Sequence, residues 1–280
     1  MSVVPFDALA CPLDGHPLVR DGASWRCADG HVFDIARQGY VHLLPVQHKR
    51  SRDPGDSKAM VAARQRFLNS GSYQPVAAAV SRAALADAPP DARCLDAGSG
   101  EGYYLRALAS ALDAGQSIAA LGVDISKWAV LAAARQDARP AWVVGSNAHL
   151  PVRSGTVERL LCLFGFPVYA EFARVLKAGG RLIQADAGPA HLRELREIIY
   201  PSLKPARDPG DATPAGFSRL ARETVCYPLD LHSPDQIADL LAMTPHLHRA
   251  SAEGRARAAA LPALTVTVDV RLTCFGRNGR

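Results

Sequence analysis

The sequence predicts an α/β fold in which helices cover both faces of a mostly parallel sheet, preceded by a small separate module. Two observations predict it. Between residues 75 and 280, short apolar runs alternate with stretches of helical spacing, which is typical of parallel sheets. One apolar run also ends in a glycine-rich turn at residues 98–102, the form that a strand-to-helix turn takes beside a ligand. With 280 residues, 48% of them hydrophobic, the chain can bury a sizeable core.

Residues 1–44 are predicted to form a module of their own. Cys11 and Asp14 stand in one short segment, and Cys27 and His31 in another. Because short loops can direct paired ligands at one tetrahedral zinc ion, Cys11, Cys27 and His31 are candidate ligands. Either Asp14 or His16 could be the fourth ligand, with Asp14 at the place of a second knuckle cysteine. The alternative is a loosely held module without metal, since about 40 residues bury little apolar surface.

Residues 45–74 are predicted to form a basic linker that leads into a helix. Its basic residues stand together, namely His48, Lys49, Arg50 and Arg52. Such a cluster can bind RNA phosphates with an affinity that falls as salt rises. The alternative is a solvated linker, because Asp53 and Asp56 follow directly. Asp56 or Ser57 is expected to cap the helix that comes next.

Residues 75–280 are predicted to form the main α/β domain. A helix begins near Pro75 and ends at the Pro89-Pro90 pair. Apolar runs then predict the strands at 93–96, 118–124, 141–145, 159–164 and 180–186. Two later strand candidates, 224–231 and 264–275, would close the far edge of the sheet.

The turn after the first of these strands is the most informative feature. Gly98, Gly100 and Gly102 alternate, and Asp96 stands two residues ahead of them. A dinucleotide fingerprint would need a glycine at Tyr103, so that match fails. The pattern instead resembles the first motif of class I methyltransferases, which have a Rossmann-like fold and use S-adenosylmethionine. This resemblance implies that the turn faces the methionine part of the cofactor. The alternative is a tight turn without a ligand.

Charge and hydropathy indicate the setting of the protein. The net charge of +5 and pI near 9.0 favour a polyanionic partner. An apolar run of about 18 residues, as a membrane span requires, is missing from the sequence. We therefore expect a soluble, cytoplasmic protein that does not associate with a membrane.

The motifs along the chain resemble those of a known family. They are the knuckles, the run from Ala36 to Asp56, the Gly71–Pro75 segment and the run from Leu95 to Tyr104. Together they resemble the RlmA-type 23S rRNA guanine-N1 methyltransferases over nearly all 280 residues. Residues 45–56 favour the Gram-negative branch, which modifies a guanine in an rRNA hairpin. The resemblance further implies a homodimer.

The resemblance also implies roles for individual residues. The positions that match or flank the cofactor site are Tyr73, Asp96, Gly98, Gly100, Glu101, Gly102, Asp124, Asn147 and His191. Asp124 ends the second predicted strand, where an acid can accept hydrogen bonds from ribose hydroxyls. Cys11, Cys27 and His31 match the zinc ligands, while Asp14 departs from the pattern. A second departure is the segment from Leu163 to Tyr169, where the family carries an Ala-Pro loop.

The chemistry of the reaction suggests one further candidate residue, and two other functions are alternatives. Removing a proton from guanine N1 needs a base, and Asp186, at the end of a predicted strand, could serve. Its alternative role is to cap a loop. The first rival function is methylation of a small molecule, which the two departures would favour. The second is a non-catalytic RNA-binding protein that kept the fold.

Overall fold

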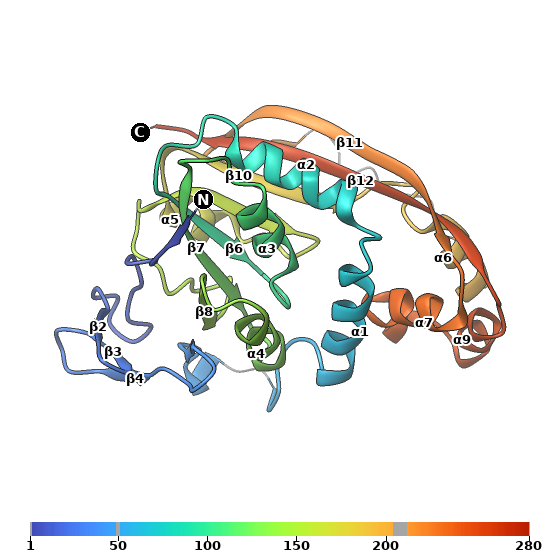
Figure 1. Ribbon diagram of the computed structural model, residues 1–280, viewed down its shortest axis with the longest axis horizontal. Helices are drawn as coiled ribbons and strands as arrows, with labels where there is room; N and C mark the ends of the chain where they lie inside the picture. Colours follow the sequence, from blue (N-terminus) through green and yellow to red (C-terminus); the bar gives the residue numbers. More distant parts are fainter. Residues whose placement is uncertain (1, 49–50, 204–211, 280) are drawn as a thin grey trace.

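A computed structural model describes residues 2–48, 51–203 and 212–279 of the chain. Its main feature is a nine-stranded sheet (Figure 1). In spatial order the strands are β11 (Phe217–Leu231), β12 (Leu264–Arg277), β10 (Leu176–Ala187), β9 (Val157–Leu163), β6 (Ala92–Ala97), β7 (Ser117–Asp124), β8 (Ala141–Val144) and β5 (Tyr40–His42), with β1 (Ser2–Val4) beside β7. The ladders from β5 to β10 are parallel, and β12 and β11 add antiparallel pairs. The predicted α/β fold is thus confirmed, and the carboxyl ends of the parallel strands meet at one edge.

Helices lie on both faces of this sheet (Figure 1). On one face are α2 (Gln74–Leu85), α3 (Tyr103–Ser110) and α4 (Lys127–Gln136), and on the other is α5 (Tyr169–Val175). The remaining helices are η1 (Val46–His48), α1 (Lys58–Asn69), α6 (Arg193–Ile199), α7 (Pro234–Ala242), α8 (His246–Arg249) and α9 (Ala252–Ala259). Of the two expected caps for α1, the structure uses Ser57, whose side chain accepts the Met60 N–H.

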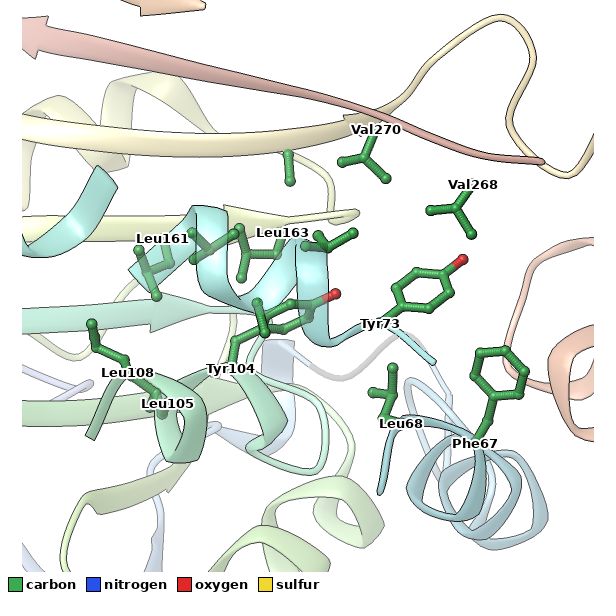
Figure 2. Close-up of a cluster of buried hydrophobic side chains, with 14 of the residues drawn as sticks. Phe67, Leu68, Tyr73, Tyr104, Leu105, Leu108, Leu161, Leu163, Val268 and Val270 are labelled. Carbon is green, nitrogen blue, oxygen red and sulfur yellow. The ribbon is translucent and has the colours of Figure 1, made fainter. Parts of the chain in front are cut away.

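Apolar side chains fill the space between the sheet and the helices of the first face. Figure 2 shows Tyr73 between Phe67 of α1 and Val268 of β12, at the edge of this cluster. Leu161 and Leu163 of β9 belong to the same cluster and are buried. Each fully buried side chain of this size contributes about 1.5–3 kcal/mol to folding. The cluster therefore holds Tyr73 firmly, at the edge where the parallel strands end.

The amino-terminal region contains a second, three-stranded antiparallel sheet. Its strands are β2 (Val19–Asp21), β3 (Ser24–Arg26) and β4 (Val32–Asp34). On either side of it in sequence, β1 pairs with β7 and β5 pairs with β8. The ends of the segment predicted as a separate module, residues 1–44, are therefore built into the large sheet, and the domain boundary at residue 44 stays a prediction.

All five parallel strands that the sequence predicts are present, and so are both closing strands. β11 begins earlier than expected, at Phe217, and pairs with β12 along its whole length. No helix in the described part of the chain has the length and hydropathy needed to cross a membrane.

Candidate functional site: a cofactor crevice and a metal-ligand cluster

The glycine turn links the end of β6 to the start of α3. Gly98, Gly100 and Gly102 have φ angles of 97°, 56° and 83°, the left-handed region that favours glycine. At Gly102 a second constraint applies, because an added Cβ would lie 2.5 Å from the ring of Trp142. Trp142 is fully buried and donates its indole N–H to the Asp137 carbonyl at 2.7 Å. The turn therefore has one tightly defined shape.

Asp124, at the end of β7, fixes the middle of this turn. One carboxylate oxygen accepts the Gly100 N–H at 2.9 Å, and the other accepts the Ser126 N–H at 2.8 Å. Burial raises the pKa of Asp124, and these two hydrogen bonds oppose that rise. Asp124 and the glycines thus lie side by side, as predicted. The Asp124 carboxylate links the turn after β6 to the end of β7, and we call this link the Asp124 latch.

Asp96 is a buried acid without a partner. It is 1% exposed, and neither carboxyl oxygen has a hydrogen bond from any residue that the structure describes. Burial, and then repulsion from Asp124, raises the pKa of Asp96 to about 8. An unsatisfied buried carboxyl costs about 1–3 kcal/mol, and a positively charged ligand would remove that cost. A buried acid beside the glycine turn therefore suits S-adenosylmethionine, which carries an ammonium and a sulfonium group.

Two other predicted cofactor residues border the turn. Glu101 is buried, and its carboxylate binds Arg106 at 2.9 Å and the side-chain amide of Gln136. Its structural role is to hold the turn against α3 and α4. Asn147 lies on the crevice side, because its amide donates to the Ala97 carbonyl at 3.2 Å and approaches Gly98.

Tyr73 and His191 come together from distant parts of the chain. Tyr73 precedes α2, His191 precedes α6, and the Tyr73 hydroxyl lies 3.4 Å from Nε2 of His191. The Asp269 N–H donates to Nδ1 of His191 at 3.2 Å, so a neutral imidazole carries its proton on Nε2. Burial lowers the pKa of His191 to about 4, which keeps the ring neutral near pH 7.

Phe164 completes this aromatic group; in the sequence its segment departs from the family pattern, but the residue itself has no predicted role. Its ring stacks on His191, with centroids 6.0 Å apart at 26°, and meets Tyr73 edge to face. Its φ angle is 56°, which is unusual for a bulky residue and which no residue pattern in the sequence predicts. Arg64 of α1 was missed as well. It forms an ion pair with Asp56 and lies beside Gly100.

Asp186 lies at the end of β10, as predicted, but toward the other face of the sheet. Its carboxylate accepts the side-chain amide of Gln184 at 2.8 Å, and the Tyr169 hydroxyl of α5 donates to Gln184 at 3.1 Å. Burial, followed by the charges of Asp96 and Asp186, raises the pKa of the Cys162 thiol to about 12. Both carboxylates therefore act on the Cys162 thiol of β9 through their charge.

The four candidate zinc ligands lie together beside the small sheet. The ligand atoms of Cys11, Asp14, Cys27 and His31 are all within 4.8 Å of one another. His31 Nδ1 is 2.8 Å from Asp14 Oδ2 and 3.3 Å from Cys27 Sγ. Ligands of a tetrahedral zinc ion lie about 3.3–3.8 Å apart, so small shifts would fit the four atoms to the metal. Of the two proposed fourth ligands the structure favours Asp14, because His16 pairs with Asp29 instead.

The basic linker follows β5 and leads into α1. His48 stacks on His149 at 4.8 Å, and Arg52 is exposed, whereas Lys49 and Arg50 lie outside the described residues. Farther along, Ser126 donates its hydroxyl to the Asp56 carbonyl at 2.7 Å. Asp56 of the linker thus contacts Ser126, which stands two residues after Asp124 in the sequence.

Comparisons with known proteins agree with this arrangement. Residues 9–52 match the family described as RlmA, N-terminal, a zinc ribbon, and residues 94–180 match a methyltransferase domain. A 23S rRNA (guanine(748)-N(1))-methyltransferase of Streptomyces fradiae is 34% identical over 95% of both chains. A Micromonospora griseorubida protein named for 23S rRNA guanine-N1 methylation is 36% identical, covering 95% of this chain and 96% of its own length. A Bacillus subtilis protein named for the same reaction is 32% identical over 70% of both. The chain therefore belongs to the family of RlmA-type 23S rRNA guanine-N1 methyltransferases.

Proposed function

We propose that this protein transfers the methyl group of S-adenosylmethionine to N1 of a guanine in a 23S rRNA hairpin. The observation that carries the proposal is Asp96, a buried and unpaired carboxyl beside a glycine turn that Asp124 latches. The full-length relatives named for this reaction support the substrate. When bound, S-adenosylmethionine supplies an electrophilic methyl group on a positively charged sulfur.

Each residue of the crevice has a role in this proposal. Asp96 attracts the positive charge of the donor, and Asp124 holds the turn in the shape that admits it. Asn147 lies at the adenine side of the donor, and His191 lies at its methionine side. Glu101 acts through its ion pair with Arg106 and is a positioning residue. These groups orient the donor and exclude water, which supplies much of the acceleration in a transfer of this kind.

In the transfer, a bond forms between N1 and the methyl carbon, the bond from that carbon to sulfur breaks, and the N1 proton leaves. His191 is a poor acceptor, because its Nδ1 already accepts the Asp269 N–H. Asp186 remains the proposed base: its carboxylate is on the α5 side with Gln184, but the residue lies at the carboxyl end of β10, next to the carboxyl end of β9. We expect Asp186→Asn to lower kcat by about 100-fold or more and to leave donor binding unchanged.

On the RNA side, we assign phosphate contacts to His48, Lys49, Arg50 and Arg52, and hairpin recognition to the small sheet with zinc held by Cys11, Asp14, Cys27 and His31. The homodimer and the cytoplasmic location also belong to this proposal. Light scattering at micromolar concentration tests the dimer. A mass of one chain would contradict it.

Primer extension on methylated 23S rRNA tests the proposed reaction. A methyl on N1 blocks Watson–Crick pairing, so reverse transcriptase stops one nucleotide before the product, whereas a methyl on N7 leaves pairing intact. Wild-type protein should incorporate labelled methyl and produce one stop, and Asp124→Asn should lose both. Asp113→Asn, the same change in an exposed loop, is the matched control.

The same assay separates the alternatives. Donor binding without any methyl transfer to RNA would favour a small-molecule methyltransferase, and RNA binding without donor binding would favour a non-catalytic protein. The assay also tests the predicted Gram-negative branch. The relatives reported above come from the Gram-positive genera Streptomyces, Micromonospora and Bacillus, so they do not support that branch. A stop at guanine 748, the position named for the Streptomyces fradiae enzyme, would contradict that branch.

A further inference from the structure

The segment after β9 carries two aromatic rings that the fold does not need. Phe166 is 88% exposed and makes no ring contact with any described residue. Phe164 is 41% exposed, although one face of its ring is against His191. Leaving a phenylalanine in water forgoes about 1.5–3 kcal/mol of burial. Neither exposure helps the protein to fold.

The backbone of this segment is also strained. A bulky side chain with φ near 56°, as at Phe164, costs about 1–3 kcal/mol. The Phe164 N–H donates to the Ala185 carbonyl at 2.8 Å, which helps to hold the strained conformation. Strain of this kind persists where the surrounding structure enforces it, and it gathers at binding and catalytic sites.

The position of the segment indicates what it binds. It follows β9, between β6 and β10 in the sheet, at the edge where the parallel strands end. A Cβ added at Gly165 would lie 3.7 Å from the Ala97 carbonyl, at the start of the glycine turn. The Phe164 ring is therefore next to the glycine turn, on the side of Tyr73 and His191, and Phe166 follows it two residues later in the exposed part of the segment.

We propose that Phe166 stacks on the unstacked target base, and that Phe164 forms the adjoining wall that separates this base from His191. This inference rests on the proposed function, because its occupant is a purine of the RNA substrate. Enzymes that modify a base in a hairpin take it out of its stack and hold it against aromatic side chains. Both phenylalanines are base-positioning residues, and the proton transfer belongs to other groups.

Steady-state methylation of an rRNA hairpin by Phe166→Ala tests the inference. Stacking is worth about 1–3 kcal/mol per base, so kcat/KM for RNA should fall by about 5- to 150-fold. Phe166→Trp should keep kcat/KM within a few-fold of wild type, and Phe166→Leu should fall between. Binding of S-adenosylmethionine and the melting temperature should not change, because an exposed ring supports neither.

Leu220→Ala is the matched control, since Leu220 is also a large exposed apolar side chain, 55% exposed, on the distant strand β11. Phe164→Leu is the second variant and should lower kcat/KM with the donor affinity retained. If wild type methylates RNA and Phe166→Ala stays within twofold of it, the inference is overturned and the proposed function stands. If wild type methylates no RNA, both fall together.

Discussion

The buried carboxyl of Asp96 makes donor binding depend on pH. Its pKa of about 8 means that only about 9% of the free protein carries the charged form at pH 7, and about half at pH 8. If the donor binds the ionised form, its affinity should rise about fivefold from pH 7 to 8 and less than twofold from pH 8 to 9. Calorimetric titration with S-adenosylmethionine at half-unit steps measures this curve.

The control for this titration is Asp96→Asn, in which any remaining slope belongs to the ionisation of the donor itself. This variant should bind more weakly at pH 8 and lose the fivefold rise. A wild-type affinity that stays flat between pH 7 and 8 would refute the reasoning about Asp96. S-adenosylhomocysteine, which lacks the sulfonium charge, should show a smaller rise in affinity than the donor.

Ionisation of Asp96 also affects stability. Its pKa is raised in the folded protein, so the unfolded chain ionises from about pH 4 while the folded chain keeps the proton to about pH 8. The raised pKa therefore makes the donor-free protein progressively less stable as pH rises through that range. Asp96→Asn should gain melting temperature over wild type at pH 8, and by less at pH 5.

Three further predictions concern the turn and the metal cluster. Gly102→Ala should lower the melting temperature by about 2–10 °C, because the strained φ costs about 1–3 kcal/mol and the new Cβ meets Trp142; an unchanged melting temperature would contradict this. Glu101→Gln should destabilise the protein by about 3 kcal/mol, since it leaves the charge of Arg106 without its partner, and urea unfolding measures the loss. Asp14→Cys should bind zinc more tightly than wild type in a chelator competition, because a thiolate replaces a carboxylate, and weaker binding would argue against Asp14 as a ligand.

The turn and its latch could be predicted because their signals are local. Gly98, Gly100 and Gly102 stand at fixed offsets from Asp96, and the distance along the chain to Asp124 is set by one helix and one strand. Local capping rules likewise limited the start of α1 to two residues. Where a feature depends on neighbours in sequence, residue type and spacing are enough.

Features made by distant residues could not be predicted in this way. Glu101 stands beside the glycines, but its carboxylate is directed by Arg106 and Gln136, one of them on another helix. The strained backbone of Phe164 is held by its hydrogen bond to the Ala185 carbonyl, on another strand. For Asp186, the sequence predicts the end of a strand, but the face on which its side chain lies is known only from the packing of that strand. The pairing of β5 with β8 likewise joins segments about 100 residues apart.

The attachment of the small sheet at both of its ends has a mechanical consequence. β1 precedes it and β5 follows it, and each forms a ladder with the large sheet. Because the small sheet is attached at both ends, it cannot rotate about a single connection. The distance from the metal-ligand cluster to the glycine turn therefore stays constant. Under the proposed function, we expect that an RNA hairpin which contacts both the metal-ligand cluster and the glycine turn must span this set distance.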